Sequence, residues 1–202
     1  MAAETLSRRA EYVAATRAAI LSSAAELFAG QGFEKTSIDQ VALAARISKG
    51  AIYHHFPDKR TIFEAIFLTS QEQTFADVLQ VASLEADPVR RVEVALHAFI
   101  EQYAGDPHRR ALLREAPTAL GPERMRAYDE KLALPLLRAT LDSLPGRESL
   151  TDSTADVAAR LLLAAMCEAA TGLAIEAETA AAKTDEAAQM LIRMVHGLLR
   201  WG

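Results

Sequence analysis

Cysteine is nearly absent from this chain: Cys167 is the single cysteine among 202 residues, so no internal disulfide can form. The chain also lacks any run of about 18 apolar residues, which excludes a membrane-spanning helix. Charged residues at Glu4, Arg8 and Glu11 interrupt the N-terminal segment, so that segment is not a signal peptide. We therefore expect a protein of the reducing cytoplasm with no membrane partner.

Glycine and proline are also scarce, with 9 and 7 copies, whereas hydrophobic residues make up 50% of the chain. This balance excludes a disordered protein and predicts a collapsed globular one. Long runs of Ala, Leu, Arg and Glu contain few β-branched residues, and we find no strand signal and no internal repeat. The composition therefore predicts an all-α fold.

The net charge of −5 is unevenly distributed along the chain. Residues 1–60 hold eight Lys and Arg against six Asp and Glu, a charge of +2, and the rest of the chain carries −7. A weakly basic head on an acidic body suits a protein that contacts phosphate groups with one end only. The asymmetry does not establish DNA binding by itself.

Helical periodicity, capping residues and turn signals divide the chain into segments. Asp87-Pro88 and Asp106-Pro107 each combine an N-cap residue with a proline at the first helical position. Pro135 should kink or break the helix that contains it. After a polar arm at 1–11, we expect helices at about 12–29, 36–44, 48–56, 58–80, 88–104, 107–120, 122–144, 153–179 and 185–201.

Residues 36–56 predict two short helices on either side of a tight turn. The second helix carries small and polar residues where a surface helix usually carries long charged ones. Gly50 and Ala51 allow its backbone to come close to base edges. Ser48 and Lys49 lie in its first turn, where base and phosphate contacts concentrate. This pattern is typical of a helix-turn-helix, whose second helix lies in a DNA major groove.

Other polar residues of this region can reach phosphates. Tyr53 and His54 lie one turn further along the second helix and face the flanks of the groove. Thr36 and Lys59 stand near helix starts, where side-chain and backbone donors act together with the helix dipole. These positions predict contacts to the DNA backbone.

The same residues also have ordinary structural interpretations. Short helices with small residues are common, and Tyr53 and Phe56 would by default be core aromatics. His54 and His55 suggest a metal site, but adjacent residues of a helix point about 100° apart, and no other ligand lies nearby. We therefore expect no metal and no cofactor.

The segment from Ile20 to Phe67 resembles the N-terminal domain of the tetracycline-repressor (TetR) family. The resemblance rests on Ala24-Ala25-Glu26-Leu27-Phe28, Gly32-Phe33, Thr36-Ser37-Ile38, Val41-Ala42, Ser48-Lys49-Gly50-Ala51-Ile52-Tyr53-His54-His55-Phe56 and Lys59. Arg46 departs from the pattern, because the family usually has Gly in this turn. A left-handed Arg46 would cost on the order of 1 kcal/mol; a slightly wider turn, or a contact between Arg46 and a phosphate, are the alternatives.

The resemblance implies a homodimeric transcription factor, most often a repressor, with a head at 1–57 and a ligand-binding and dimerisation domain at 58–202 that begins with a connecting helix at 58–80. Two heads would meet a pseudo-palindromic duplex operator whose major grooves lie about 34–36 Å apart. A small effector in the second domain would change the separation of the heads and release the DNA. The expected DNA-binding residues are Thr36, Ser37, Arg46, Ser48, Lys49, Gly50, Ala51, Tyr53, His54 and Lys59.

The last two expected helices carry small and apolar residues that would pack against a second copy as a four-helix bundle. The alternative is that these residues are buried within one subunit. The expected dimer residues are Leu161, Leu162, Ala165, Ala169, Leu191, Met194, Leu198 and Trp201.

The middle helices are expected to hold the effector. A largely apolar lining would suit a lipophilic or aromatic ligand, although the same residues also describe an ordinary core. The expected lining residues are Phe99, Tyr103, Leu113, Met125, Tyr128, Leu132, Leu136, Met166, Cys167 and Thr171.

An all-α enzyme is one rival function, and a carrier or interaction protein without DNA binding is another. The sequence shows no metal-ligand cluster, no glycine-rich phosphate loop and no nucleophile paired with a base. We therefore expect no enzymatic activity. Intact Lys49, Tyr53 and Lys59 argue against a head that has lost its DNA-binding function.

Overall fold

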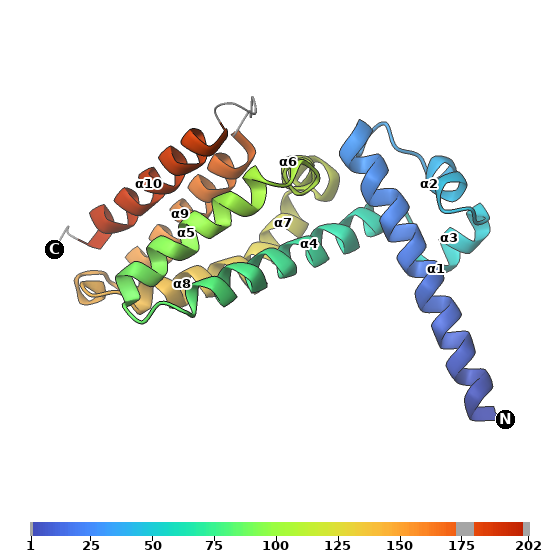
Figure 1. The fold of residues 1–202 in the computed structure, drawn as a ribbon, viewed down its shortest axis with the longest axis horizontal. Helices are drawn as coiled ribbons and strands as arrows, with labels where there is room; N and C mark the ends of the chain where they lie inside the picture. The colour runs from blue at the N-terminus through green and yellow to red at the C-terminus, as the bar shows by residue number, and fades with distance from the viewer. Residues whose placement is uncertain (1, 173–179, 200–202) are drawn as a thin grey trace.

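The computed structural model describes residues 2–172 and 180–199, and all regular structure in these ranges is helical. The predicted all-α fold is therefore confirmed. A small head built from α1, α2 and α3 lies at one end, and α4 runs from it into an elongated body (Figure 1). The elements are α1 (Ala2–Gln31), α2 (Ile38–Ala44), α3 (Lys49–His55), α4 (Lys59–Ala82), α5 (Pro88–Ala104), α6 (Pro107–Leu120), α7 (Pro122–Tyr128), α8 (Leu134–Asp142), α9 (Asp152–Gly172) and α10 (Ala180–Leu199).

The core of the head is aromatic. The ring centroids of Phe28 and Phe63 lie 5.3 Å apart, and the ring of Phe33 lies 5.3 Å from Phe63 and 5.7 Å from Phe28. Ile52 of α3 is buried and belongs to the same core. Because Phe63 belongs to α4, the connecting helix is part of the head core, and any tilt of α4 must move the head with it.

The first helix begins earlier than the sequence predicted. We expected a polar arm at 1–11 and a helix from about residue 12, but α1 begins at Ala2. The early segment is rich in Ala, Glu and Arg, which propagate a helix readily once a nucleus exists downstream. In Figure 1 this part of α1 extends beyond α2 and α3.

The helix predicted at 122–144 is interrupted, as the presence of Pro135 predicted. It consists of α7, a π-helical turn at Asp129–Ala133 and α8. The Leu134 N–H donates to the carbonyl of Asp129, five residues earlier, and Pro135 follows directly. Since proline has no N–H and its ring crowds the carbonyl four residues back, the wider turn relieves the clash.

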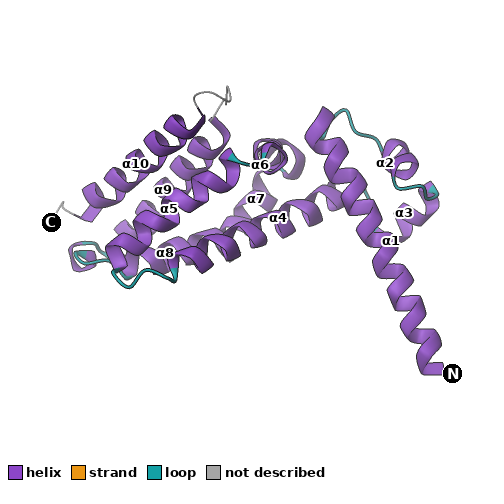
Figure 2. Cartoon of the chain, in the orientation of Figure 1, coloured by secondary structure: helices purple, strands orange, loops and turns teal. Residues whose placement is uncertain are grey.

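The C-terminal helices also differ in extent from the prediction. α9 is described as far as Gly172, whereas residues 173–179 of the helix predicted at 153–179 lie outside the described ranges. α10 begins at Ala180, five residues before the predicted start at 185. It packs along α5, where His97 Nε2 lies 2.8 Å from the Asp185 carboxylate. Figure 2 shows α10 at the outer side of the body.

Two side chains of the body contact the start of the connecting helix and the head. Arg124 of α7 forms an ion pair with Glu64 of α4, and Glu115 of α6 contacts the loop between α1 and α2. The described helices include none that is both long and apolar enough to cross a lipid bilayer.

Candidate nucleic-acid interface

The turn between α2 and α3 has a left-handed residue. Arg46 has a φ of +55° and is the one non-glycine residue with a positive φ in the described ranges. The Ile47 N–H donates to the Ala42 carbonyl at 3.0 Å and the Arg46 N–H to the Leu43 carbonyl at 3.2 Å. This is a Schellman motif, which requires a left-handed residue at the position of Arg46. The turn is therefore not widened, and Arg46 is exposed.

Both short helices begin at serine caps. The Ser37 hydroxyl accepts from the Gln40 N–H at 3.2 Å, and the Gln40 side chain accepts from the Ser37 N–H at 2.8 Å. Ser48 accepts from the Ala51 N–H at 3.1 Å. These caps satisfy N–H groups that a helix start leaves unpaired, so they fix where α2 and α3 begin.

Lys49 and Asp39 link the two helices across the exposed surface. The Lys49 ammonium lies 2.9 Å from one carboxylate oxygen of Asp39 and 3.0 Å from the other. The hydrogen bond and the charge of Asp39 raise the pKa of Lys49 above its usual value. Lys49 therefore stays cationic, and in the free protein its ammonium is paired with a carboxylate.

Gly50 has no structural requirement for its missing side chain. A Cβ built at Gly50 would meet only the Ser48 hydroxyl oxygen, at 3.9 Å, which is ordinary contact. Its neighbour Ala51 is half-buried, while the side chains of Tyr53 and His54 are exposed. A small residue on an open helix face keeps the backbone accessible to a large partner.

Two predicted contacts are occupied within the head. Thr36 is only 2% exposed, and its hydroxyl donates to the Gly32 carbonyl at 2.9 Å. The Lys59 ammonium donates to the Phe33 carbonyl at 2.7 Å and lies 4.2 Å from the centroid of the Phe33 ring. Thr36 thus fixes the loop between α1 and α2, and its buried hydroxyl is not exposed to a phosphate. The Lys59 ammonium can donate to a further partner only with the N–H groups that these two contacts leave free.

Two further residues are exposed on this surface that were not among the predicted contacts. Leu43 of α2 is 81% exposed, and Gln40 is exposed beside it. Leu43 lies in an apolar stretch, which by pattern alone favours a buried position. Its exposure follows from the burial of Val41 and Ala42, since the next residue of a helix points about 100° away.

The body contains an apolar cavity of about 60 Å³ between α4, α5, α8 and α9. It brings together three of the predicted pocket residues, Phe99, Leu136 and Met166. Leu113, Met125, Leu132 and Thr171 do not line it. Tyr103, Tyr128 and Cys167 do not line it either. Tyr103 contacts the lining residue Phe99, with ring centroids 5.0 Å apart. Cys167 directly follows the lining residue Met166 in α9.

The predicted dimer residues divide between two environments. Leu161 is 57% exposed and Met194 is also exposed, whereas Leu162 and Leu191 are buried in the core of the single chain. Ala165, Ala169 and Leu198 are half-buried, and Trp201 lies outside the described residues. For Leu162 and Leu191, the alternative interpretation of burial within one subunit holds.

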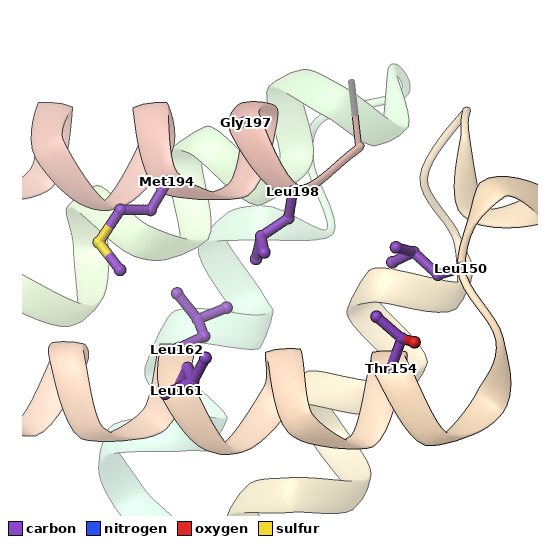
Figure 3. A pocket seen from close by; sticks show the side chains of 7 residues that line it. All are labelled: Leu150, Thr154, Leu161, Leu162, Met194, Gly197 and Leu198. Carbon is purple, nitrogen blue, oxygen red and sulfur yellow. The ribbon is translucent and has the colours of Figure 1, made fainter. Parts of the chain in front are cut away.

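An apolar groove of about 620 Å³ opens between α9 and α10. Figure 3 shows Met194 and Leu198 of α10 directed toward Leu161 and Leu162 of α9, with Leu150 and Thr154 at one end. The groove lies beside the exposed Leu161 and Met194 side chains, so it is continuous with the exposed face of these two helices.

Comparison with protein families finds two matches. Residues 20–66 match the model for bacterial regulatory proteins of the tetR family, and residues 89–198 match that for the tetracyclin repressor-like C-terminal domain. The probable acrEF/envCD operon repressor of Escherichia coli (strain K12) is 32% identical over 102 residues, which is 49% of this chain and 46% of that protein. The chain thus spans about half the length of the curated relatives it matches.

Solved structures show the same fold. A TetR-family transcriptional regulator from Pectobacterium atrosepticum aligns with a TM-score of 0.71 and 25% identity, covering 94% of this chain and 97% of that one. A tetR family transcription regulator from Shewanella sp. PV-4 aligns with a TM-score of 0.73 at 20% identity, covering 88% and 96%. The similarity therefore includes both the head and the body.

Proposed function

The chain belongs to the tetracycline-repressor (TetR) family of bacterial regulatory proteins, and from this premise we propose that it is a repressor that binds a pseudo-palindromic operator as a homodimer. A small effector bound in the body releases the DNA. The family is one of regulatory proteins and not of enzymes. The operator is part of a bacterial genome, so the protein acts in the cytoplasm.

The observation that carries the DNA-binding role is the open face of α3. A side chain would fit at Gly50 within the single chain, so packing inside the head does not explain the glycine. A helix that enters the major groove needs such a residue where its backbone approaches base edges. Ser48 and Ala51 flank this position, and Tyr53 and His54 are exposed one turn further on.

Phosphate binding requires Lys49 to exchange partners. In the free protein Lys49 is paired with Asp39; in the complex a phosphate replaces or shares the carboxylate. Since both groups are exposed, the exchange costs little. Ser37 and the left-handed Arg46 lie at the edge of the same surface, where they contact backbone phosphates.

Dimerisation uses the exposed face of α9 and α10. Val157 and Leu161 form one stripe with a spacing of four residues, and Met190 and Met194 form the other. Residues four apart lie on the same face of a helix, so each helix presents an apolar edge to solvent in the single chain. A second copy related by a two-fold axis would cover both stripes and the groove between them.

The experiment that tests this function is an electrophoretic shift on the DNA upstream of the gene. The double variant Lys49→Ala/Tyr53→Ala should lose the shift, while Lys131→Ala, an exposed change in the body, should keep it. Binding by the unchanged protein should weaken steeply with salt, since released counterions drive it. An unchanged shift in the double variant would show that α3 is not the recognition helix, and no shift with the unchanged protein would favour a carrier or interaction protein.

A further inference from the structure

Two buried polar atoms in the body have no hydrogen-bond partner among the residues that the structure describes. They are Nε2 of Gln71 in α4 and the hydroxyl oxygen of Tyr128 in α7. Gln71 is only 4% exposed. Leaving such a group unpaired costs about 1–3 kcal/mol, so native proteins usually provide a partner. Both atoms therefore call for a ligand group or another polar partner.

The two atoms belong to one small polar cluster. The Tyr103 hydroxyl donates to Oε1 of Gln71 at 3.0 Å, which leaves only the amide nitrogen of Gln71 unpaired. The Tyr128 ring packs on Phe67, one turn before Gln71 on α4, with their centroids 5.1 Å apart. Tyr128 is also within electrostatic reach of Tyr103 and Cys167. Gln71, Tyr103 and Tyr128 are thus held in one region of the core.

This cluster adjoins the apolar cavity. Phe75, one turn after Gln71, lines the cavity, and so does Phe99, whose ring contacts Tyr103. Met166, beside Cys167 in α9, lines it as well. The core therefore contains an apolar cavity with the polar cluster of Gln71, Tyr103 and Tyr128 at one side. Small-molecule sites typically combine an apolar lining with a few polar groups in this way.

We propose that the effector is an uncharged, largely apolar molecule with one hydrogen-bond acceptor, such as a ketone, ester or amide carbonyl. Its acceptor binds the Gln71 amide N–H and the Tyr128 hydroxyl, and its apolar part occupies the cavity lined by Phe75, Phe99 and Met166. This inference rests on the proposed function, since it identifies the class of molecule that releases the DNA.

The required group is an acceptor because both unpaired atoms can donate. An amide nitrogen only donates, and the Tyr128 hydroxyl stays protonated because burial raises its pKa well above the usual value of a tyrosine. One carbonyl oxygen has two lone pairs and can accept from both donors.

An anionic effector is disfavoured by the charges around Tyr128. The carboxylates of Asp129 and Glu72 lie within electrostatic reach of its hydroxyl. Arg109 is a cation within electrostatic reach of the Tyr103 hydroxyl, but it is already bound to the Thr74 hydroxyl at 3.0 Å and to the Gln102 side chain. A carboxylate ligand would therefore be repelled by Asp129 and Glu72 near Tyr128. Near Tyr103 it would meet Arg109, whose guanidinium is already hydrogen-bonded to other side chains.

The cavity must expand when the effector binds. Its volume of about 60 Å³ is below the roughly 150 Å³ of an apolar cavity that holds benzene. Side chains such as Met166 must rotate, and α4 and α8, which supply the walls, must move apart. Because Phe63 of α4 belongs to the head core, this movement reaches the head. The free structure is therefore the closed form of the site.

The test uses three probes that share one ring: acetophenone, ethylbenzene and benzoate, each titrated calorimetrically into the full chain. The neutral acceptor of acetophenone should bind about ten- to a hundredfold more tightly than ethylbenzene, the value of its two hydrogen bonds. Benzoate should bind more weakly than acetophenone. Equal binding of ethylbenzene, stronger binding of benzoate, or no binding of any probe at millimolar concentration would each overturn the proposal.

Tyr128→Phe provides a second test. It removes only an unpaired hydroxyl, so thermal stability should be unchanged or higher, while acetophenone affinity should fall about three- to tenfold and ethylbenzene affinity should stay the same. Tyr12→Phe, on an exposed tyrosine of α1, is the matched control. Lower stability with unaltered acetophenone affinity would show that the hydroxyl has a structural partner and would overturn the assignment. DNA binding measured without any probe tests the proposed function separately.

Discussion

The carboxylate of Glu115 in α6 accepts a hydrogen bond from the backbone N–H of Phe33 at 3.2 Å. The Phe33 carbonyl accepts a hydrogen bond from the Lys59 ammonium at 2.7 Å. The loop between α1 and α2 is thus held by the body on one side and by α4 on the other. Because α6 also carries Arg109, which reaches Thr74 beside the polar cluster, one helix contacts both the head and the proposed effector site.

Replacing Glu115 by Ala should leave the Phe33 N–H without its partner. We expect the free energy of unfolding to fall by about 1–2 kcal/mol, because the lost acceptor is charged and the site is partly buried. Glu115→Gln keeps an acceptor oxygen and should lose less. Denaturant unfolding of both variants measures the difference. Equal losses would show that the charge of Glu115, rather than this hydrogen bond, stabilises the contact.

Replacing Arg46 by Gly should stabilise the protein by about 0.5–1 kcal/mol, because glycine adopts a left-handed conformation without the cost that Arg46 carries. If Arg46 contacts a phosphate, the slope of log affinity against log salt should fall by about 1. Arg46→Lys is the control, since it keeps the charge and the unfavourable conformation. A less stable Arg46→Gly variant would contradict this account of the turn.

Replacing Gly50 by Ala should leave the folded head intact, because the added methyl group meets only ordinary contacts. DNA affinity should fall at least about tenfold, a loss of about 1.4 kcal/mol, as the methyl group separates α3 from the base edges. Gly30→Ala, where a Cβ also meets open space, is the matched control and should bind DNA normally. Unfolding curves and electrophoretic shifts give the two measurements. Normal binding by the Gly50 variant would place α3 outside the groove.

Replacing Leu161 by Glu should convert the dimer to a folded monomer. The side chain is exposed in the single chain, so the charge disturbs only the proposed interface. Leu84→Glu, on a more exposed leucine just after α4, is the control and should remain dimeric. Analytical ultracentrifugation at micromolar concentration distinguishes the two states. A dimer in both variants would show that the copies associate through another face.

The helix-turn-helix could be predicted from the sequence because its signals are local. Ser37 and Ser48 cap α2 and α3 as the capping pattern predicts, and the small residues of α3 need no distant partner to indicate their role. The helical break near Pro135 is local for the same reason, since it follows from the missing N–H of one residue.

Other features could not be predicted because they depend on packing. Leu161 and Leu162 are neighbours in an apolar run, yet one faces solvent and the other the core. Periodicity did not separate them, because the direction of the core follows from where α5 and α10 lie relative to α9. The position of Thr36 near a helix start predicted a phosphate contact, but its hydroxyl is hydrogen-bonded to the Gly32 carbonyl, which only the folded loop brings close.

The sequence by itself determined the all-α fold, the position of the two short helices and the small and polar residues along α3, since these follow from backbone propensities and caps over a few residues. Only the tertiary structure decided the conformation of Arg46, the division between core and exposed faces in α9 and α10, and the unpaired donors of Gln71 and Tyr128. Whether a polar atom has a partner depends on helices that are distant in sequence, and folding alone brings them together.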